Sequence, residues 1–99
     1  MGISARLTNY HGATVDTVTG HDINELVEAA RERSYPMLGY IDAYGDTQFN
    51  VVQMQLLIPE LESLESAGPE AVRATATALL ELARKVPRRP HQYLLFLGD

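Results

Sequence analysis

Hydrophobic and polar residues alternate over residues 3–9 and again over residues 13–18. A period of two is typical of strands that bury one face. The segment between them, Asn9-Tyr10-His11-Gly12, consists of residues that favour turns, and Gly12 can adopt a positive φ. This pattern predicts a β-hairpin near the start of the sequence.

A helix is predicted after the hairpin. Asp22 is followed by Glu25 at the spacing of a capping box, and apolar residues then recur every three or four positions. Pro36 ends this pattern, because proline disfavours helical geometry in the residue before it. Residues 37–41, MLGYI, form a short apolar run between helix-breaking residues. We interpret this run as a buried strand.

Two further helices are predicted in the second half of the chain. The earlier one starts at Asn50, and Pro59 predicts a kink or a break inside it because proline has no backbone donor. The later one has Pro69 at its first helical position and stops at Pro87. An apolar segment over residues 92–97 then predicts the last strand.

The expected order of elements is β-β-α-β-α-α-β. A chain of 99 residues makes one domain, residues 1–99. The economical arrangement is an α+β fold in which about four strands form a single mixed sheet with three helices packed on it. The connection through one helix predicts that the second and third strands are parallel. The paired later helices predict a last strand antiparallel to the third.

The composition narrows the classes of function. The net charge of −5 argues against nucleic-acid binding, which depends on neutralising phosphates, and suits a basic partner. The chain has no cysteine, which excludes disulfides and thiolate chemistry. No apolar run reaches the roughly 20 residues of a membrane span, and the first residues lack the apolar stretch of a signal peptide. We therefore expect a cytoplasmic protein without membrane contact.

The expected topology brings distant polar residues to one rim of the sheet. If the two later helices form a hairpin, the chain returns to the rim at which the strand over residues 37–41 ends. His11 is expected at the opposite rim. The polar residues expected together at the first rim are His21, Asp42, Tyr44, Asp46, Arg88, Arg89 and His91.

The segment Tyr40–Asn50, YIDAYGDTQFN, is the candidate site. Helix capping explains Asn50, and turn geometry explains Gly45. Asp42 and Tyr44 have no such local explanation, and tyrosine is enriched at protein interfaces. The acids lack the residue order of a calcium loop, and no histidine motif for zinc is present. We therefore predict neither a metal nor a cofactor.

Two segments resemble a protein family. The run Y-[IV]-D-x-Y-G-D-T-x-F-N at Tyr40–Asn50 and the run H-x-Y-L-x-F-x-G-D at His91–Asp99 resemble a family of short bacterial proteins without an assigned activity. They cover about a fifth of the chain, and the resemblance implies no catalytic residue. In size, acidity and lack of cysteine the chain is also similar to small bacterial immunity and antitoxin proteins, which implies a protein partner.

The leading hypothesis is a binding module without catalysis. In its concrete form, an immunity-type or antitoxin-type inhibitor places its acidic loop in a basic cleft of a partner protein. Asp42, Tyr44 and Asp46 are the expected contacts. Arg88 and Arg89 are expected to join them from the same rim.

The alternative is a small enzyme or ligand-binding protein at that rim. Asp42 or Asp46 would act with His91 as the acid–base groups, and Arg88 would hold an anion. The basic stretch Arg84–Arg89 is interpreted either as compensation of a helix dipole or as a contact for phosphate or an acidic partner. A homodimer through the terminal strand or the second helix is a third alternative.

Overall fold

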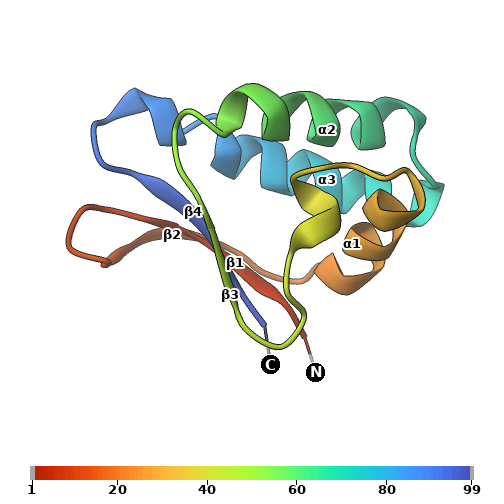
Figure 1. Cartoon of the computed structure of the whole chain (residues 1–99), viewed down its shortest axis with the longest axis horizontal. Coiled ribbons are helices and arrows are strands. Elements are labelled where there is room, and N and C mark those ends of the chain that lie inside the picture. Colours follow the sequence, from red (N-terminus) through yellow and green to blue (C-terminus); the bar gives the residue numbers. More distant parts are fainter. Residues whose placement is uncertain (1, 99) are drawn as a thin grey trace.

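The computed structural model describes residues 2–98, which form an α+β domain with the predicted order of elements (Figure 1). The strands are β1 (Ser4–Thr8), β2 (Thr14–Val18), β3 (Asp46–Phe49) and β4 (Tyr93–Leu97). The helices are α1 (Ile23–Glu32), α2 (Met54–Ala67) and α3 (Glu70–Ala83), with short 3-10 helices η1 (Leu38–Tyr40) and η2 (Val86–Arg88). None of the described helices combines the length and the apolar character needed to cross a bilayer.

The four strands form one sheet in the order β2-β1-β4-β3, and each neighbouring pair is antiparallel. The sheet is thus antiparallel rather than mixed, and the expected parallel alignment of the second and third strands does not occur. The last strand is antiparallel to the third, as predicted. β4 is hydrogen-bonded on both sides, so the terminal strand has no free edge with which to form a dimer.

All three α-helices lie on one face of the sheet, with α3 against β1 and β2, and α2 beside α3 (Figure 1). The covered face is apolar: Leu7, Leu94 and Phe96 are at most 1% exposed. The rings of Phe49 and Phe96 pack edge to face with their centroids 5.9 Å apart. On the other face Arg6 is exposed. The core therefore lies between the sheet and the helical layer.

The predicted hairpin of β1 and β2 is confirmed, and residues of its turn stabilise the reversal of the chain. The Oδ1 atom of Asn9 accepts hydrogen bonds from the backbone N–H groups of His11 and Ala13, both at 3.0 Å. Gly12 has a φ of 77°, a conformation that a side chain would strain. These two features reverse the chain direction between β1 and β2.

The predicted cap is present at α1, whereas α2 begins at Met54 and not directly after Asn50, and its N-cap residue Gln53 makes no side-chain cap. Asp22 Oδ1 accepts a hydrogen bond from the backbone N–H of Glu25 at 3.1 Å. Asn50 and Gln53 do form the predicted reciprocal pair, in which each side-chain oxygen accepts from the other residue's N–H, at 2.9 and 2.8 Å, but this pair encloses the turn at residues 51–53 that precedes α2. α2 continues through Pro59, so no break occurs there. Proline removes one backbone donor, and packing of α2 against α3 keeps the rest of the helix together.

Residues 37–41 do not form the predicted strand. Leu38 and Ile41 are both buried and lie three positions apart, which matches one turn of 3-10 helix. The carboxylate of Glu60 on α2 accepts the backbone N–H groups of Met37 at 3.0 Å and Leu38 at 2.8 Å. Because this side chain takes two donors that a strand would offer to a neighbouring strand, the segment folds as a turn.

The third strand instead lies later in the sequence, at β3. Thr47 and Phe49 are more buried than Asp46 and Gln48, which are exposed, as expected for an edge strand with one covered face. The loop over residues 42–45 therefore precedes the third strand instead of following it. This shift moves the loop to the opposite rim of the sheet from the one at which the third strand ends.

Candidate functional site

The loop over residues 42–45 connects η1 to β3 at the rim where β1 begins and β4 ends. It forms the lowest turn in Figure 1, close to both ends of the chain. The backbone N–H of Asp42 donates to Thr47 Oγ1 at 3.0 Å, and that of Tyr44 donates to Asp42 Oδ1 at 2.8 Å. The Asp42 carboxylate thus supports the turn locally, a role that the sequence did not indicate.

Two glycines lie at close contacts of this loop. The backbone N–H of Gly98 donates to the carbonyl oxygen of Gly45 at 2.8 Å. A Cβ atom on Gly98 would lie 2.5 Å from the carbonyl carbon and oxygen of Ala43, and one on Gly45 would lie 2.7 Å from Asp42 Oδ2. Both distances are shorter than van der Waals contact. The contact at Gly98 is with backbone atoms, which cannot move aside, whereas the contact at Gly45 is with the end of a side chain, and Gly45 has no positive φ.

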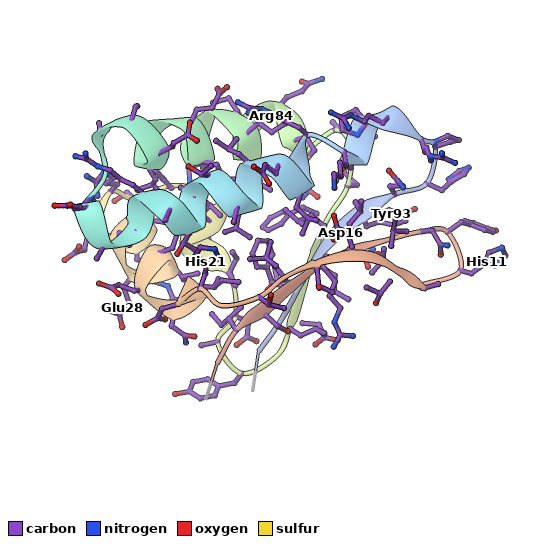
Figure 2. All side chains as sticks on the ribbon, turned by 180° about the vertical axis from the view of Figure 1, so that it is seen from behind. His11, Asp16, His21, Glu28, Arg84 and Tyr93 are labelled. Carbon is purple, nitrogen blue, oxygen red and sulfur yellow. The ribbon has the colours of Figure 1, made fainter. Side chains whose placement is uncertain are left out.

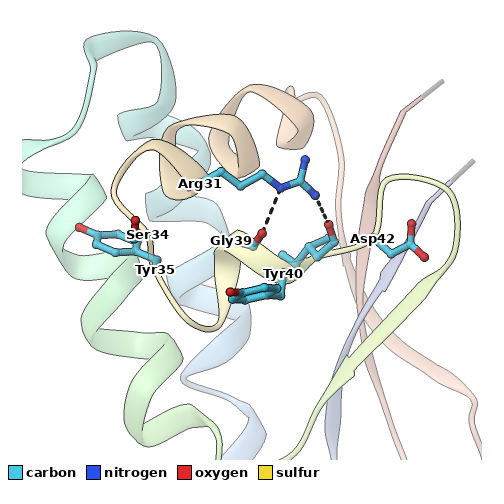
Figure 3. Close-up of a pocket in the computed structure, with 7 residues that line it drawn as sticks. Arg31, Ser34, Tyr35, Gly39, Tyr40 and Asp42 are labelled. Atoms are coloured by element: carbon cyan, nitrogen blue, oxygen red, sulfur yellow. Dashed lines mark hydrogen bonds between the residues drawn. The ribbon is translucent and has the colours of Figure 1, made fainter.

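The segment before the loop is fixed by Arg31, in the last turn of α1. Its Nε donates to the carbonyl oxygen of Gly39 at 3.0 Å, and its Nη2 donates to that of Ile41 at 2.7 Å (Figure 3). Together with the glycine contacts, these bonds hold the backbone of residues 39–45 in one conformation.

A cavity of about 470 Å³, open to solvent, lies beside this segment (Figure 3). Its volume is in the range of small-ligand sites. The hydroxyl of Tyr35 donates to Ser63 Oγ at 2.8 Å, so Tyr40 is the less constrained ring of the two tyrosines in the cavity wall. The lining residues are Arg31, Ser34, Tyr35, Gly39, Tyr40, Ile41 and Asp42.

Two tyrosines stand out from this surface. Tyr44 is 86% exposed and Tyr40 is 79% exposed. Asp42 and Asp46, beside them in the sequence, are also exposed. We refer to these four residues as the acidic rim.

The structure separates the acidic loop from residues 88–91, which were predicted to lie together at one rim. β3 begins at Asp46 in the acidic rim and ends at Phe49 at the opposite rim, where β4 begins. Residues 88–91 directly precede β4 and lie at that second rim. The strand from Asp46 to Phe49 alone spans about 10 Å. The predicted acid–base pairing of Asp42 or Asp46 with His91 is therefore wrong.

The cause is the position of the third strand. α2 and α3 do return the chain to the rim where that strand ends, as expected. Because the strand occupies residues 46–49 and not 37–41, the acidic loop lies at its beginning. Arg88 and Arg89 are exposed at the opposite rim and do not join the acidic loop in one surface.

Two of the three histidines occupy other places than expected, whereas His21 follows β2, which ends at the rim where β1 begins and the loop over residues 42–45 lies. His11 and His91, predicted at opposite rims, share one rim: the ring of Tyr10 lies 5.2 Å from the first and 5.1 Å from the second, measured between centroids. His21 Nδ1 lies 3.4 Å from Thr75 Oγ1 on α3. Within residues 2–98, no group of three or more His, Cys, Asp or Glu side chains is arranged to hold a metal ion.

Sequence reasoning missed the supporting residues of this site. Tyr40 was assigned to the buried strand, and Arg31 was not considered, although a basic residue in a last helical turn often binds nearby carbonyl groups. Glu60 lies beside Leu57 and Leu61 on the buried face of α2. That position was the available signal that its carboxylate is buried and therefore hydrogen-bonded.

Comparison of the chain with known protein families, with curated protein sequences and with solved structures found no match. The functional assignment therefore rests on the geometry of the chain itself.

Proposed function

We propose that the protein is a non-catalytic binding module that contacts a basic protein partner through the acidic rim. One observation carries this proposal: Tyr44 and Tyr40 are the most exposed of the large hydrophobic side chains in the described chain, yet their backbone is held in place. An aromatic side chain on a preorganised backbone can be buried by a partner at a low entropic cost. Tyrosine is also enriched among the residues that dominate binding energy.

The charge around the tyrosines supports a basic partner. Asp42 and Asp46 are exposed beside Tyr44, and the chain has a net charge of −5. Complementary charge accelerates encounter and suppresses wrong partners. The cavity beside Tyr40 offers room for a side chain of the partner, and a cation there could lie against the phenol ring.

The most concrete form of this proposal is an inhibitor of the immunity or antitoxin type, whose loop occupies a basic cleft on its partner. The size and acidity of the chain support this form, as does a loop that projects from the rim of the sheet. The catalytic alternative paired Asp42 or Asp46 with His91, and His91 lies at the other rim of the sheet.

Capture of the partner from the native host tests the proposal. The chain has no cysteine, so Ala74→Cys on the exposed side of α3 gives a single thiol for biotin and leaves both rims free. We expect Tyr44→Ala to lower recovery of the partner by more than about tenfold, as for a dominant interface residue. Tyr10→Ala is the matched control: its side chain is 69% exposed at the opposite rim, and its loss should leave recovery unchanged.

Two results would count against the proposal. If Tyr44→Ala and Asp46→Asn both retain the same partner as the unmodified protein, the acidic rim is not the interface. With the purified partner, the association rate should fall as ionic strength rises. An association rate that is independent of salt would contradict a basic partner.

A further inference from the structure

A second cavity, of about 240 Å³, lies at the rim opposite the acidic rim. It is lined by Val15, Lys85, Arg88, Arg89 and Gln92. Three of these five residues are cationic, in a chain whose net charge is −5. They come from β2, from the segment around η2 and from the residue before β4, so the fold brings them together where the chain turns from α3 back to the sheet (Figure 1).

Gln92 is the buried polar group of this cavity. Its side chain is 7% exposed, and its Oε1 atom is buried without a hydrogen-bond partner in the described part of the chain. Buried acceptors are nearly always paired, because an unpaired one loses its hydration without compensation. Gln92 lines the cavity, and rotation of its side-chain amide would turn the covered Oε1 atom toward a ligand that supplies the missing donor.

The available positive charge in the cavity lies on the two arginines. Lys85 Nζ is paired with Asp16 Oδ2 at 2.6 Å, and this hydrogen bond holds the pKa of the Asp16 carboxyl below its ordinary value. Figure 2 shows Asp16 between α3 and the hairpin end that carries His11. Arg88 and Arg89 are exposed and form no salt bridge with a carboxylate of residues 2–98. Guanidinium groups match oxyanions with paired hydrogen bonds.

The ligand that fits is therefore an anion that also donates a hydrogen bond. We infer that the cavity binds a phosphate group that retains one proton, with its charged oxygens on Arg88 and Arg89. Its P–OH donates to Gln92 Oε1 once the side-chain amide has rotated toward the cavity. A phosphate monoester has a second pKa of about 6 and keeps this proton at mildly acidic pH. A sulfate or carboxylate group carries the charge but has no proton to donate there. This site is independent of the acidic rim and of the function proposed for it.

Discrimination between phosphate and sulfate tests this assignment. We would titrate the protein near pH 6 with inorganic phosphate, phenyl phosphate and sulfate, and follow the backbone and side-chain amide signals of residues 88–92 by NMR. Phosphate should bind at least about tenfold more tightly than sulfate, the effect of one satisfied buried hydrogen bond. Sulfate has the higher charge, so simple electrostatic attraction predicts the opposite order.

Variants assign the two parts of the recognition. Gln92→Met keeps the length of the side chain and removes the acceptor, so it should lower phosphate affinity to that of sulfate. Arg88→Gln with Arg89→Gln should weaken both anions at least tenfold. Arg6→Gln, an exposed arginine on the open face of the sheet, is the control and should change neither affinity.

Each outcome of these titrations either supports or overturns the inference. Equal affinity for phosphate and sulfate, or unchanged phosphate affinity in Arg88→Gln/Arg89→Gln, would overturn the inference. The two arginines are exposed, so that variant remains informative even if Gln92→Met does not fold. Tighter binding of phenyl phosphate than of inorganic phosphate would identify the ligand as a monoester, with Val15 as an apolar wall for its organic part. Weaker binding of phenyl phosphate than of inorganic phosphate would identify free phosphate.

Discussion

Replacing Glu60 tests the account of how residues 37–41 are held. Glu60 is 8% exposed, and its two carboxylate oxygens accept the N–H groups of Met37 and Leu38. Leu38 is fully buried, so its N–H has no access to water when the carboxylate is removed. Glu60→Ala should therefore destabilise the fold and release η1 from α2.

The expected loss of unfolding free energy in Glu60→Ala follows from these two hydrogen bonds. A hydrogen bond to a charged group contributes about 1.5–3 kcal/mol, and Met37, which is only partly buried, can regain part of this from water. Removing the carboxylate also relieves the cost of burying a charge. The net loss should be about 2–4 kcal/mol, which lowers the melting temperature by roughly 10–25 °C for a domain of this size. Glu60→Gln retains one acceptor oxygen and should lose about half as much.

Urea unfolding followed by circular dichroism measures the loss, and Glu62→Ala is the matched control. Glu62 is on the same helix, its side chain is 51% exposed, and it pairs with Arg84 at 3.1 Å. The change in helix propensity is the same in both variants, so it cancels in the comparison. The control should lose less than about 1 kcal/mol, as is typical of exposed ion pairs.

Hydrogen exchange measures whether η1 itself is released in Glu60→Ala. The amide of Leu38 should be protected in the native protein and should exchange at least about tenfold faster in Glu60→Ala. If Glu60→Ala is as stable as Glu62→Ala and the Leu38 amide stays protected, the carboxylate does not hold the turn. The explanation for the missing strand would then be refuted.

Two further predictions concern the loop and the electrostatics. Gly98→Ala should cost about 1–3 kcal/mol in thermal unfolding and shift the amide signal of Tyr44, because the new Cβ would lie 2.5 Å from the loop carbonyl; Gly2→Ala, with open space around it, should have no effect. The lowered pKa of Asp16, below 3.8, implies stability that is present above this ordinary value and is lost as the pH falls through the lowered pKa of the folded state. Lys85→Met should thus be less stable than the native protein at neutral pH, by less than about 1 kcal/mol because both side chains are about 40% exposed. An equal difference near pH 2 would contradict this.

Local patterns predicted much of this fold. The hairpin, the cap of α1 and the capping box before α2 depend on residues within four positions of each other, so the sequence contains all of the information for them. The helical hairpin followed from the apolar periodicity of its two helices. Together these elements determined the order of strands and helices.

The third strand could not be located in the same way. A run such as residues 37–41 fits a buried strand and a buried turn equally well. Glu60 decides between them, and it lies more than twenty positions later in the sequence. The alternation of Thr47 and Phe49 indicated the true strand, but the aspartates and glycine before it resembled an ordinary loop.

That single misplacement explains why the residues predicted to lie together are divided between two rims of the sheet. Asp42 and Tyr44 were singled out because capping and turn geometry did not explain them. Their juxtaposition with residues 88–91 depended on the direction of the third strand, and the error in its position reversed the geometry. The orphaned oxygen of Gln92 has no sequence signal, because its burial results from tertiary packing.

The central position of β4 has a consequence for how the protein reaches its native state. β4 is inserted between β1 and β3, so the middle of the sheet depends on pairing between segments at nearly opposite ends of the sequence. Until residues 93–97 have left the ribosome, both neighbouring strands have an unpaired edge, and the nascent helices have no complete surface on which to pack. Closing such a long loop is slow. The nascent chain should therefore stay sensitive to protease and depend on chaperones until its final strand is inserted.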